Sequence, residues 1–235
     1  MMEITEEKKL MAKAGSAYSH AWRIMWDNFI SLFLVALIII VAATPYAITA
    51  RIEDFSDHFG IMAIALVMGQ IFTMVYTLFV MSPLSYGSNW VYLKAVRKEK
   101  FEVQDLFDVF RNYINVLLAA LLSGAIIVFG FFFLIIPGII FACRLAFVPY
   151  LVMDKRLDAV KAVEESWRLT KGHGWRILWM GLIAFFVFIL GLVCLVFGAI
   201  VSAMWISAAF ASFYQAVLAE KGEDVIPVVE NGEKA

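Results

Sequence analysis

Arg144 is the residue of this chain whose type and position most clearly predict chemistry. It is the only charged residue in an apolar run that extends over residues 113–153. A charged side chain inside a membrane is costly and by default marks a functional site. Two interpretations are open. Either the guanidinium snorkels to the head groups or makes structural hydrogen bonds, or it faces an internal groove and contacts a phosphate, a lipid head group or another anion.

The sequence offers no set of metal ligands. None of the three histidines, His20, His58 and His173, has a second histidine or a cysteine at ligand spacing. Both cysteines, Cys143 and Cys194, lie inside apolar runs, where a small packing role is expected. We therefore expect no metal and no cofactor.

Catalytic patterns are equally scarce. Glu164-Glu165, with Arg168 close by, could suggest an intramembrane protease, but such a site would also need histidines inside the membrane. An exposed, charged helix face is the simpler interpretation. The expected spans hold neither Asp nor Glu, which argues against a carrier that moves protons through carboxylates. We therefore expect no enzyme and no catalytic residues.

The elements that position these residues are membrane helices. Hydrophobic residues make up 63% of the 235 residues and charged residues 17%. About 20 apolar helical residues cross a bilayer once. The apolar blocks 29–50, 61–93, 113–153 and 176–219 therefore predict an all-α integral membrane protein with six transmembrane helices in three hairpins. Each hairpin is preceded by an amphipathic helix, in the segments 1–28, 94–112 and 158–171.

The chain divides into three parts on this interpretation. Residues 1–28 form an amphipathic cytoplasmic leader, 29–220 a six-span membrane domain and 221–235 a polar tail of the disordered type. The first apolar block lacks the features of a cleaved signal peptide, so we expect it to be retained.

Proline and glycine suggest where the spans break. Pro137-Gly138 predicts a turn between spans at 113–136 and 139–153. Pro83 predicts a kink or break after a span at 61–81, and the polar segment 82–93 that follows lies either at the interface or along a cavity. The last two spans turn near residues 191–202.

Further local patterns concern packing. We interpret Trp22, Phe110 and Trp167, each followed by an arginine, as interface anchors or as marks of a threefold repeat. Asp158 can cap the third amphipathic helix, and Glu164 can pair with Arg168. A small-residue stripe on the last span (Ala203, Ser207 and Ala211) favours close helix packing, within one chain or between chains.

The distribution of positive charge predicts the topology. Apart from Arg51 and Arg144, every lysine and arginine lies in segments 1–28, 94–112, 154–176 and 221–235. Positive residues collect on the cytoplasmic side of a membrane protein. Both termini are therefore expected in the cytoplasm, with the Pro137-Gly138 turn outside and Arg144 in the outer half of the bilayer, about 9 Å along the helix from that turn.

The run PGIIFACRLAFVPYLVMDK, followed by ESWRLTKG, resembles the signature of the YciC-like bacterial inner-membrane proteins and of the related membrane domain of glycerophosphoryl diester phosphodiesterases. The shared positions include Pro137, Gly138, Pro149, Asp154, Ser166 and Thr170. The resemblance implies the six-span fold, a structural role for these residues and a bacterial or archaeal cytoplasmic (inner) membrane. No segment outside the membrane is long enough for the phosphodiesterase domain, so that activity is not carried over.

These observations lead to two expected functions. The first is a non-enzymatic multi-pass protein that acts as a scaffold or partner-binding module and forms a homo-oligomer or binds a membrane-protein partner. The alternative is a lipid- or anion-handling transporter or channel that uses a cavity around Arg144. Membrane lipids are partners in both cases. A net charge of −1 gives no reason to expect nucleic acid.

Overall fold

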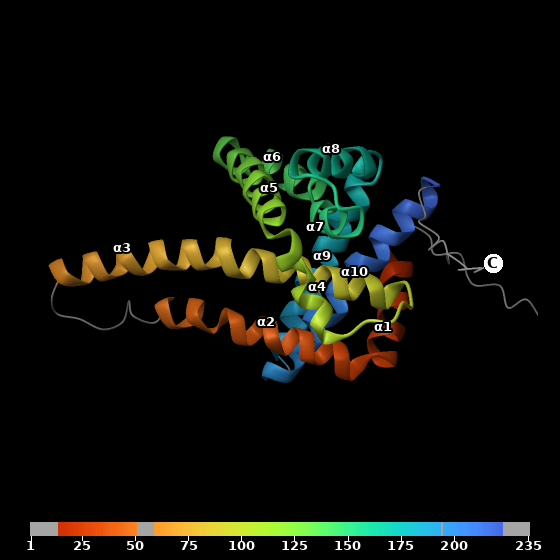
Figure 1. Ribbon diagram of the computed structural model, residues 1–235, viewed down its shortest axis with the longest axis horizontal. Helices are drawn as coiled ribbons and strands as arrows, with labels where there is room; N and C mark the ends of the chain where they lie inside the picture. Colours follow the sequence, from red (N-terminus) through yellow and green to blue (C-terminus); the bar gives the residue numbers. More distant parts are fainter. Residues whose placement is uncertain (1–13, 51–58, 194, 223–235) are drawn as a thin grey trace, which may run out of the picture.

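The computed structural model describes residues 14–50, 59–193 and 195–222 (Figure 1). Every regular element in these ranges is a helix. The start of the predicted leader, most of the loop after the first apolar block and nearly all of the predicted tail lie outside the described residues. Five helices are long and apolar enough to cross a membrane, or six if the pair α1 and α2, which is bent by 99°, counts as one span. These helices are compatible with a multi-pass membrane protein.

The first half of the chain runs from α1 to η3. Its elements are α1 (Ala14–Asp27), α2 (Phe29–Ala50), α3 (Phe59–Tyr76), the π-helix η2 (Thr77–Met81), α4 (Ser82–Val96) and the 3-10 helix η3 (Val103–Asn112). The second half is made of α5 (Tyr113–Phe133), α6 (Ile135–Arg144), α7 (Val148–Asp154), α8 (Ala159–Thr170), α9 (Gly174–Val193) and α10 (Leu195–Glu220).

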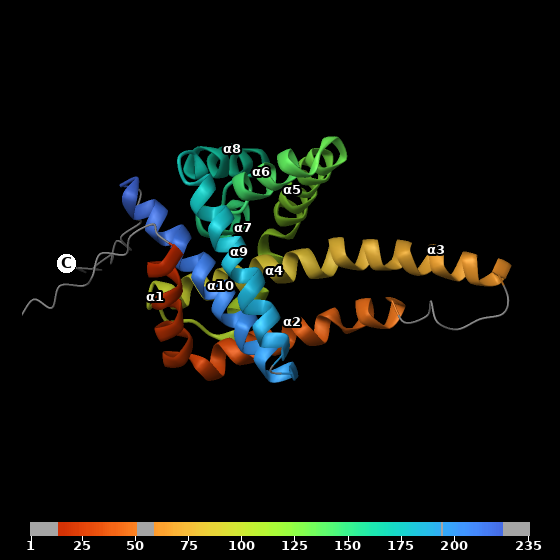
Figure 2. The ribbon, with the colours of Figure 1, turned by 180° about the vertical axis from the view of Figure 1, so that it is seen from behind.

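The core forms around α4 and α10, which cross near the middle of the molecule (Figures 1 and 2). Most residues of α4 are buried, although the sequence predicted that 82–93 would lie at the interface or along a cavity. Gly87 explains part of this close packing, because a Cβ atom there would collide with the carbonyl oxygen of Leu106 in η3. The alanine-rich second half of α10 is buried as well, and Ala211 of the predicted stripe packs within the chain.

Pro83 was predicted to kink or break the helix; a break is not found, because α3, η2 and α4 form one continuous helical run. A π-turn precedes the proline, and the Ser82 amide donates to the Thr77 carbonyl, five residues back. Proline has no N–H to offer the Phe79 carbonyl, four residues earlier. The Tyr113 hydroxyl of α5 donates to that carbonyl instead, at 2.8 Å. A partner from another helix thus keeps the run intact, as happens at prolines in membrane helices.

The turn between α5 and α6 also differs from the prediction. The extended residue is Leu134, while Pro137 and Gly138 lie in the first turn of α6. A proline fits there, since the first-turn N–H groups have no helical acceptor. Gly138 instead allows close packing, because a Cβ atom on it would overlap the Phe131 ring of α5.

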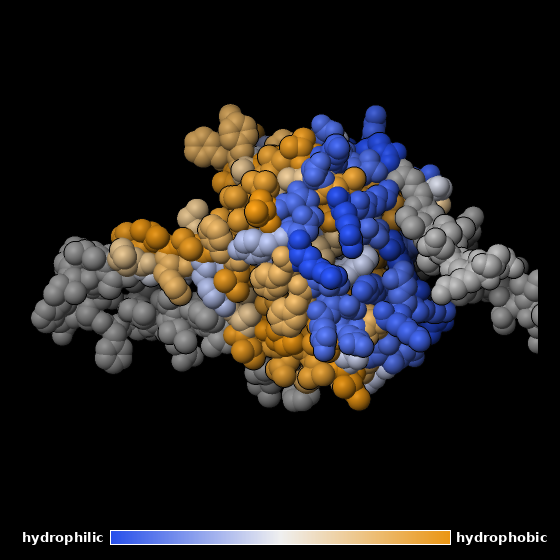
Figure 3. All heavy atoms as spheres, viewed as in Figure 1, coloured by the Kyte–Doolittle hydropathy of each residue, from blue (hydrophilic) through white to orange (hydrophobic). Residues whose placement is uncertain are grey.

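The predicted fourth span, 139–153, is divided between α6 and α7 by a break at residues 145–147. α9 ends at Val193 and α10 begins at Leu195, both within the range in which the last two spans were predicted to turn. Hydrophobic residues gather on the side of α2, α3, α5 and α6, and a hydrophilic band covers the opposite side (Figure 3).

The amphipathic segments are helical but not as predicted in detail. The second is a 3-10 helix that buries Leu106 and Val109, while Phe107 and Phe110 are half-exposed. The third, α8, buries the side of Ala162, Ser166 and Leu169, while the apolar side chains of Val160 and Trp167 are exposed.

Two local contacts of α8 also correct the prediction. Asn115 of α5, rather than Asp158, caps the helix, since its side-chain oxygen accepts from the Ala159 amide at 2.9 Å. Arg168 pairs with Glu165, not with Glu164, through hydrogen bonds of 2.6 and 2.8 Å.

The Tyr113 hydroxyl gives a first test of this fold. Tyr113→Phe should destabilise the protein by about 1 kcal/mol, because it removes the hydrogen bond to a carbonyl that lacks the Pro83 donor. In a Pro83→Ala background the new N–H can take over this carbonyl, so the same change should cost less. Reversible unfolding in mixed micelles measures all four variants. Equal costs in both backgrounds would show that the hydroxyl does not compensate for the proline.

Candidate functional site

The break between α6 and α7 is held by the amphipathic helix α8. The Ser166 hydroxyl donates to the Arg144 carbonyl at 2.7 Å, and the Thr170 hydroxyl lies 3.3 Å from the same oxygen. The Phe147 amide donates to the Ser166 hydroxyl at 3.3 Å. Two side chains of α8 thus satisfy backbone groups that the break releases from helical hydrogen bonds, as buried polar groups require. This is where the structure places two of the residues singled out from the sequence, Ser166 and Thr170.

Arg144 is the last residue of α6, and its guanidinium lies 5.7 Å from the ring centre of Trp167. Its Nη1 atom is buried and has no hydrogen-bond partner among the described residues. Because α6 begins after Leu134, Arg144 lies about 15 Å along the helix from the turn, rather than the predicted 9 Å. It therefore lies level with α8 rather than close to the tip of the hairpin.

A groove of about 540 Å³ lies beside Arg144, between α6 and the first turns of α9. Its walls include Ile136, Ile139, Ile140, Trp175 and Leu178. Among the described residues that line the groove, Arg144 alone is charged. An apolar groove with a single cation fits an amphiphilic anion, since one part of the ligand would need the charge and the rest would need the apolar walls.

The C-terminal end of α7 carries a buried ion pair. Asp154, the last residue of α7, accepts hydrogen bonds of 2.6 and 2.7 Å from Arg97, which follows α4. The Arg97 and Asp154 side chains are only 10% and 5% exposed. Gln215 and Tyr214 of α10 complete the cluster, at 2.9 Å from Arg97 and 3.1 Å from Asp154.

The electrostatics of the pair are favourable on balance. Burial acts to lower the pKa of the Arg97 guanidinium, but the hydrogen bonds and the negative charge of Asp154 outweigh it, so the pKa is raised. The Tyr214 ring stacks on Tyr150 of α7 at 5.0 Å between ring centres. Pro149 lies in the first turn of α7, where its missing N–H has no cost. The cluster joins α4, α7 and α10.

Sequence reasoning singled out Asp154 but missed Arg97, Gln215 and Tyr214. A signal was present, since Gln215 is a polar residue in an otherwise apolar span and Arg97 follows an apolar block. Neither signal identifies Asp154 as the partner of Arg97, because the two residues are 57 positions apart in the sequence.

The predicted interface anchors are partly exposed, and each contacts another aromatic ring or a cation. Trp22 packs against Trp205 at 4.9 Å, and Phe110 stacks on Phe107 at 6.2 Å. Trp167 contacts Phe141 and Arg144. Their role at a membrane interface stays a prediction.

Within residues 14–50, 59–193 and 195–222, no group of three or more His, Cys, Asp or Glu residues is arranged to hold a metal ion. The expected absence of cofactors and of catalysis stays a prediction.

No family model, no curated protein and no solved structure matches this chain. The resemblance to the YciC-like proteins and to the phosphodiesterase membrane domain therefore stays a prediction that rests on the motif residues.

The Arg97–Asp154 pair gives a second test. Arg97→Met should destabilise the protein by about 3 kcal/mol, because it leaves a buried carboxylate without its partner. Adding Asp154→Leu should recover much of this loss. Arg168→Met, which removes an arginine from a more exposed pair, serves as the control and should cost less than about 1 kcal/mol. If Arg97→Met cost no more than this control in reversible unfolding, the pair would not be a main support of the fold.

Proposed function

We propose that this protein is a six-span cytoplasmic-membrane protein that binds an anionic phospholipid in the groove between α6 and α9. The single observation that carries the proposal is the Nη1 atom of Arg144, which is buried without a hydrogen-bond partner among the described residues. An unpaired buried cation is costly, and a phosphate or carboxylate would remove that cost.

The groove favours a lipid over a small soluble anion. Ile136, Ile139, Ile140 and Leu178 give it an apolar lining on which an acyl chain can lie. Trp175 and Trp167, beside the arginine, are 69% and 40% exposed. Partly exposed tryptophans next to a cation are typical of the level at which lipid head groups lie. A phospholipid would place its phosphate at Arg144 and one chain along α6.

The expected topology is compatible with this proposal. The hydrophilic band of the surface gathers on the side away from α2 and α3 (Figure 3). The positive charges favour an orientation in which this band faces the cytoplasm. In that orientation both termini are cytoplasmic. Arg144 then lies nearer the inner leaflet than the sequence suggested. The contact of Arg144 with α8 supports that level.

The scaffold function, the homo-oligomer, the membrane-protein partner and the absence of enzyme activity stay predictions. The lipid proposal is a narrower form of the alternative function expected from the sequence. It requires binding only, and it makes no claim of transport.

Native mass spectrometry of the protein in mild detergent tests the proposal. The wild-type protein should retain an anionic phospholipid. Arg144→Leu should lower its occupancy about tenfold, which corresponds to the loss of one charge-assisted hydrogen bond. Arg144→Lys should retain part of the occupancy, since it keeps the charge but not the planar guanidinium.

A second pair of variants tests the groove without changing the charge. Ile140→Trp fills the groove and should also displace the lipid. Ile135→Trp introduces the same side chain at a 69% exposed position of α6 that does not line the groove, and it should have no effect. Thermal unfolding confirms that each variant is folded. Retention of the lipid by folded Arg144→Leu, or equal loss in both tryptophan variants, would refute the proposal.

A further inference from the structure

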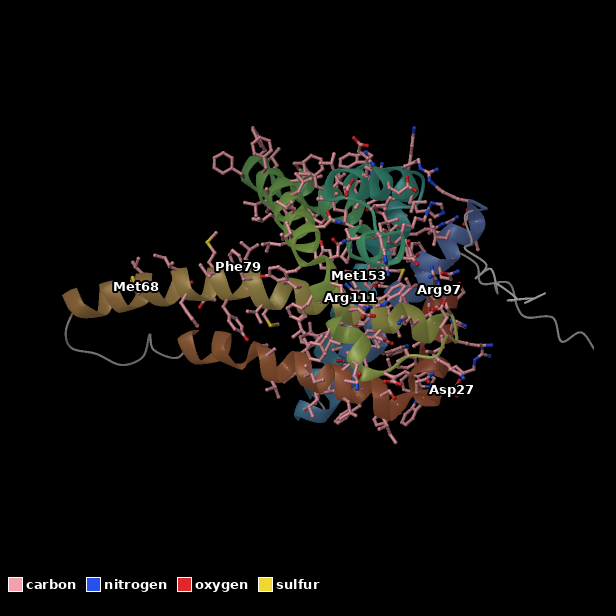
Figure 4. The ribbon with its side chains drawn as sticks, in the orientation of Figure 1. Asp27, Met68, Phe79, Arg97, Arg111 and Met153 are labelled. Atoms are coloured by element: carbon pink, nitrogen blue, oxygen red, sulfur yellow. The ribbon has the colours of Figure 1, made fainter. Side chains whose placement is uncertain are left out.

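A second pocket, distinct from the lipid groove, lies on the hydrophilic side of the molecule between α4, η3 and the end of α7. Its volume is about 740 Å³. Figure 4 labels Arg111 of η3 and Met153 of α7, which both line it, far from Met68 on the projecting α3. Other lining residues are Trp90, Lys94, Asp108, Asp154 and Arg156. The pocket thus holds three cationic side chains from three separate segments.

Each of the two carboxylates of the pocket has a cationic partner, but only Asp154 is held tightly. Asp154 accepts both hydrogen bonds of the Arg97 guanidinium and a third from Tyr214, and is almost completely buried. Asp108 lies 3.8 Å from Arg111, which is 82% exposed and holds this partner only loosely. With Arg97 directly behind Asp154, the region has an excess of positive charge.

The cations differ in how firmly they are held. Lys94 lies over the Trp90 ring at 5.2 Å and 3.1 Å from Asp105, so its position is fixed. Arg156 is exposed, lines the pocket and has no ion pair with any described residue. Its backbone adopts the left-handed conformation, with φ 49°, which is uncommon for a residue other than glycine. This conformation lets the chain turn sharply after α7, between Asp154 and α8.

We propose that this pocket binds a phosphate-bearing anion, with Arg156 and Arg111 as its main contacts and Lys94 as a fixed positive charge. Two arginines offer planar donor forks that match phosphate oxygens, and their donors have few competing partners in the described chain. The phosphate belongs to a soluble phosphate ester or to a phospholipid head group. The site is independent of Arg144, which lies at the break between α6 and α7, before the whole of α7.

Equilibrium dialysis with radiolabelled inorganic phosphate tests the site on the full chain. The protein is held in phosphatidylcholine nanodiscs, and chloride keeps the ionic strength constant. The wild-type protein should bind phosphate saturably, and Arg156→Gln should weaken binding about tenfold. Arg23→Gln removes the same charge from an exposed position of α1 that does not line the pocket, and it should leave binding unchanged.

Asp108→Asn provides a test of opposite sign, because it removes a carboxylate that competes for Arg111. This variant should bind phosphate several-fold more tightly. Absence of saturable binding by the wild-type protein would overturn the proposal. Equal losses in Arg156→Gln and Arg23→Gln would also overturn it, since they would show attraction by the general surface charge.

Nanodiscs that contain phosphatidylglycerol distinguish the two sources of phosphate. If phosphate binds equally in both kinds of nanodisc, the site accepts a soluble ester. If phosphatidylglycerol abolishes the binding while Asp108→Asn still strengthens it in phosphatidylcholine, the lipid head group is the ligand. Both results support a phosphate site in this pocket.

Discussion

The buried ion pair between Arg97 and Asp154 is the interaction on which the rest of the structure most depends. It fixes the end of α7, a helix of seven residues that is too short to be stable alone. Through Tyr214 and Gln215 it also fixes α10, the central helix of the molecule. Both proposed sites rely on this pair. Asp154 lies in the wall of the polar pocket, and the lipid groove runs along α6, which precedes α7 in the same segment.

The break before α7 explains how a charged residue is tolerated beside an apolar groove. In a continuous helix the Arg144 carbonyl would accept from a backbone amide four residues later. Here the hydroxyls of Ser166 and Thr170 take that place. The backbone is therefore satisfied by α8, while one nitrogen of the guanidinium has no partner among the described residues. On the proposed function, a ligand would supply that partner once the guanidinium rotates toward the groove, with no change in the backbone.

The sequence predicted where the apolar and the amphipathic helical segments lie, because composition and periodicity are local properties. It failed where the deciding contact is distant. Pro83 does not break its helix because a hydroxyl from Tyr113 compensates for it. Asp154 was singled out from the sequence, but its partner Arg97 was not, because the two residues are far apart along the chain. The distance of Arg144 from the turn was underestimated because the extended residue is Leu134, which precedes the Pro-Gly pair.

A structure of the protein determined in nanodiscs that contain anionic phospholipid tests the central claim most directly. The account predicts density for a lipid phosphate within hydrogen-bond distance of Arg144 Nη1, with an acyl chain along Ile139 and Ile140. A groove closed by Trp175, with the Arg144 guanidinium paired to a side chain of the protein or turned toward water, would contradict it.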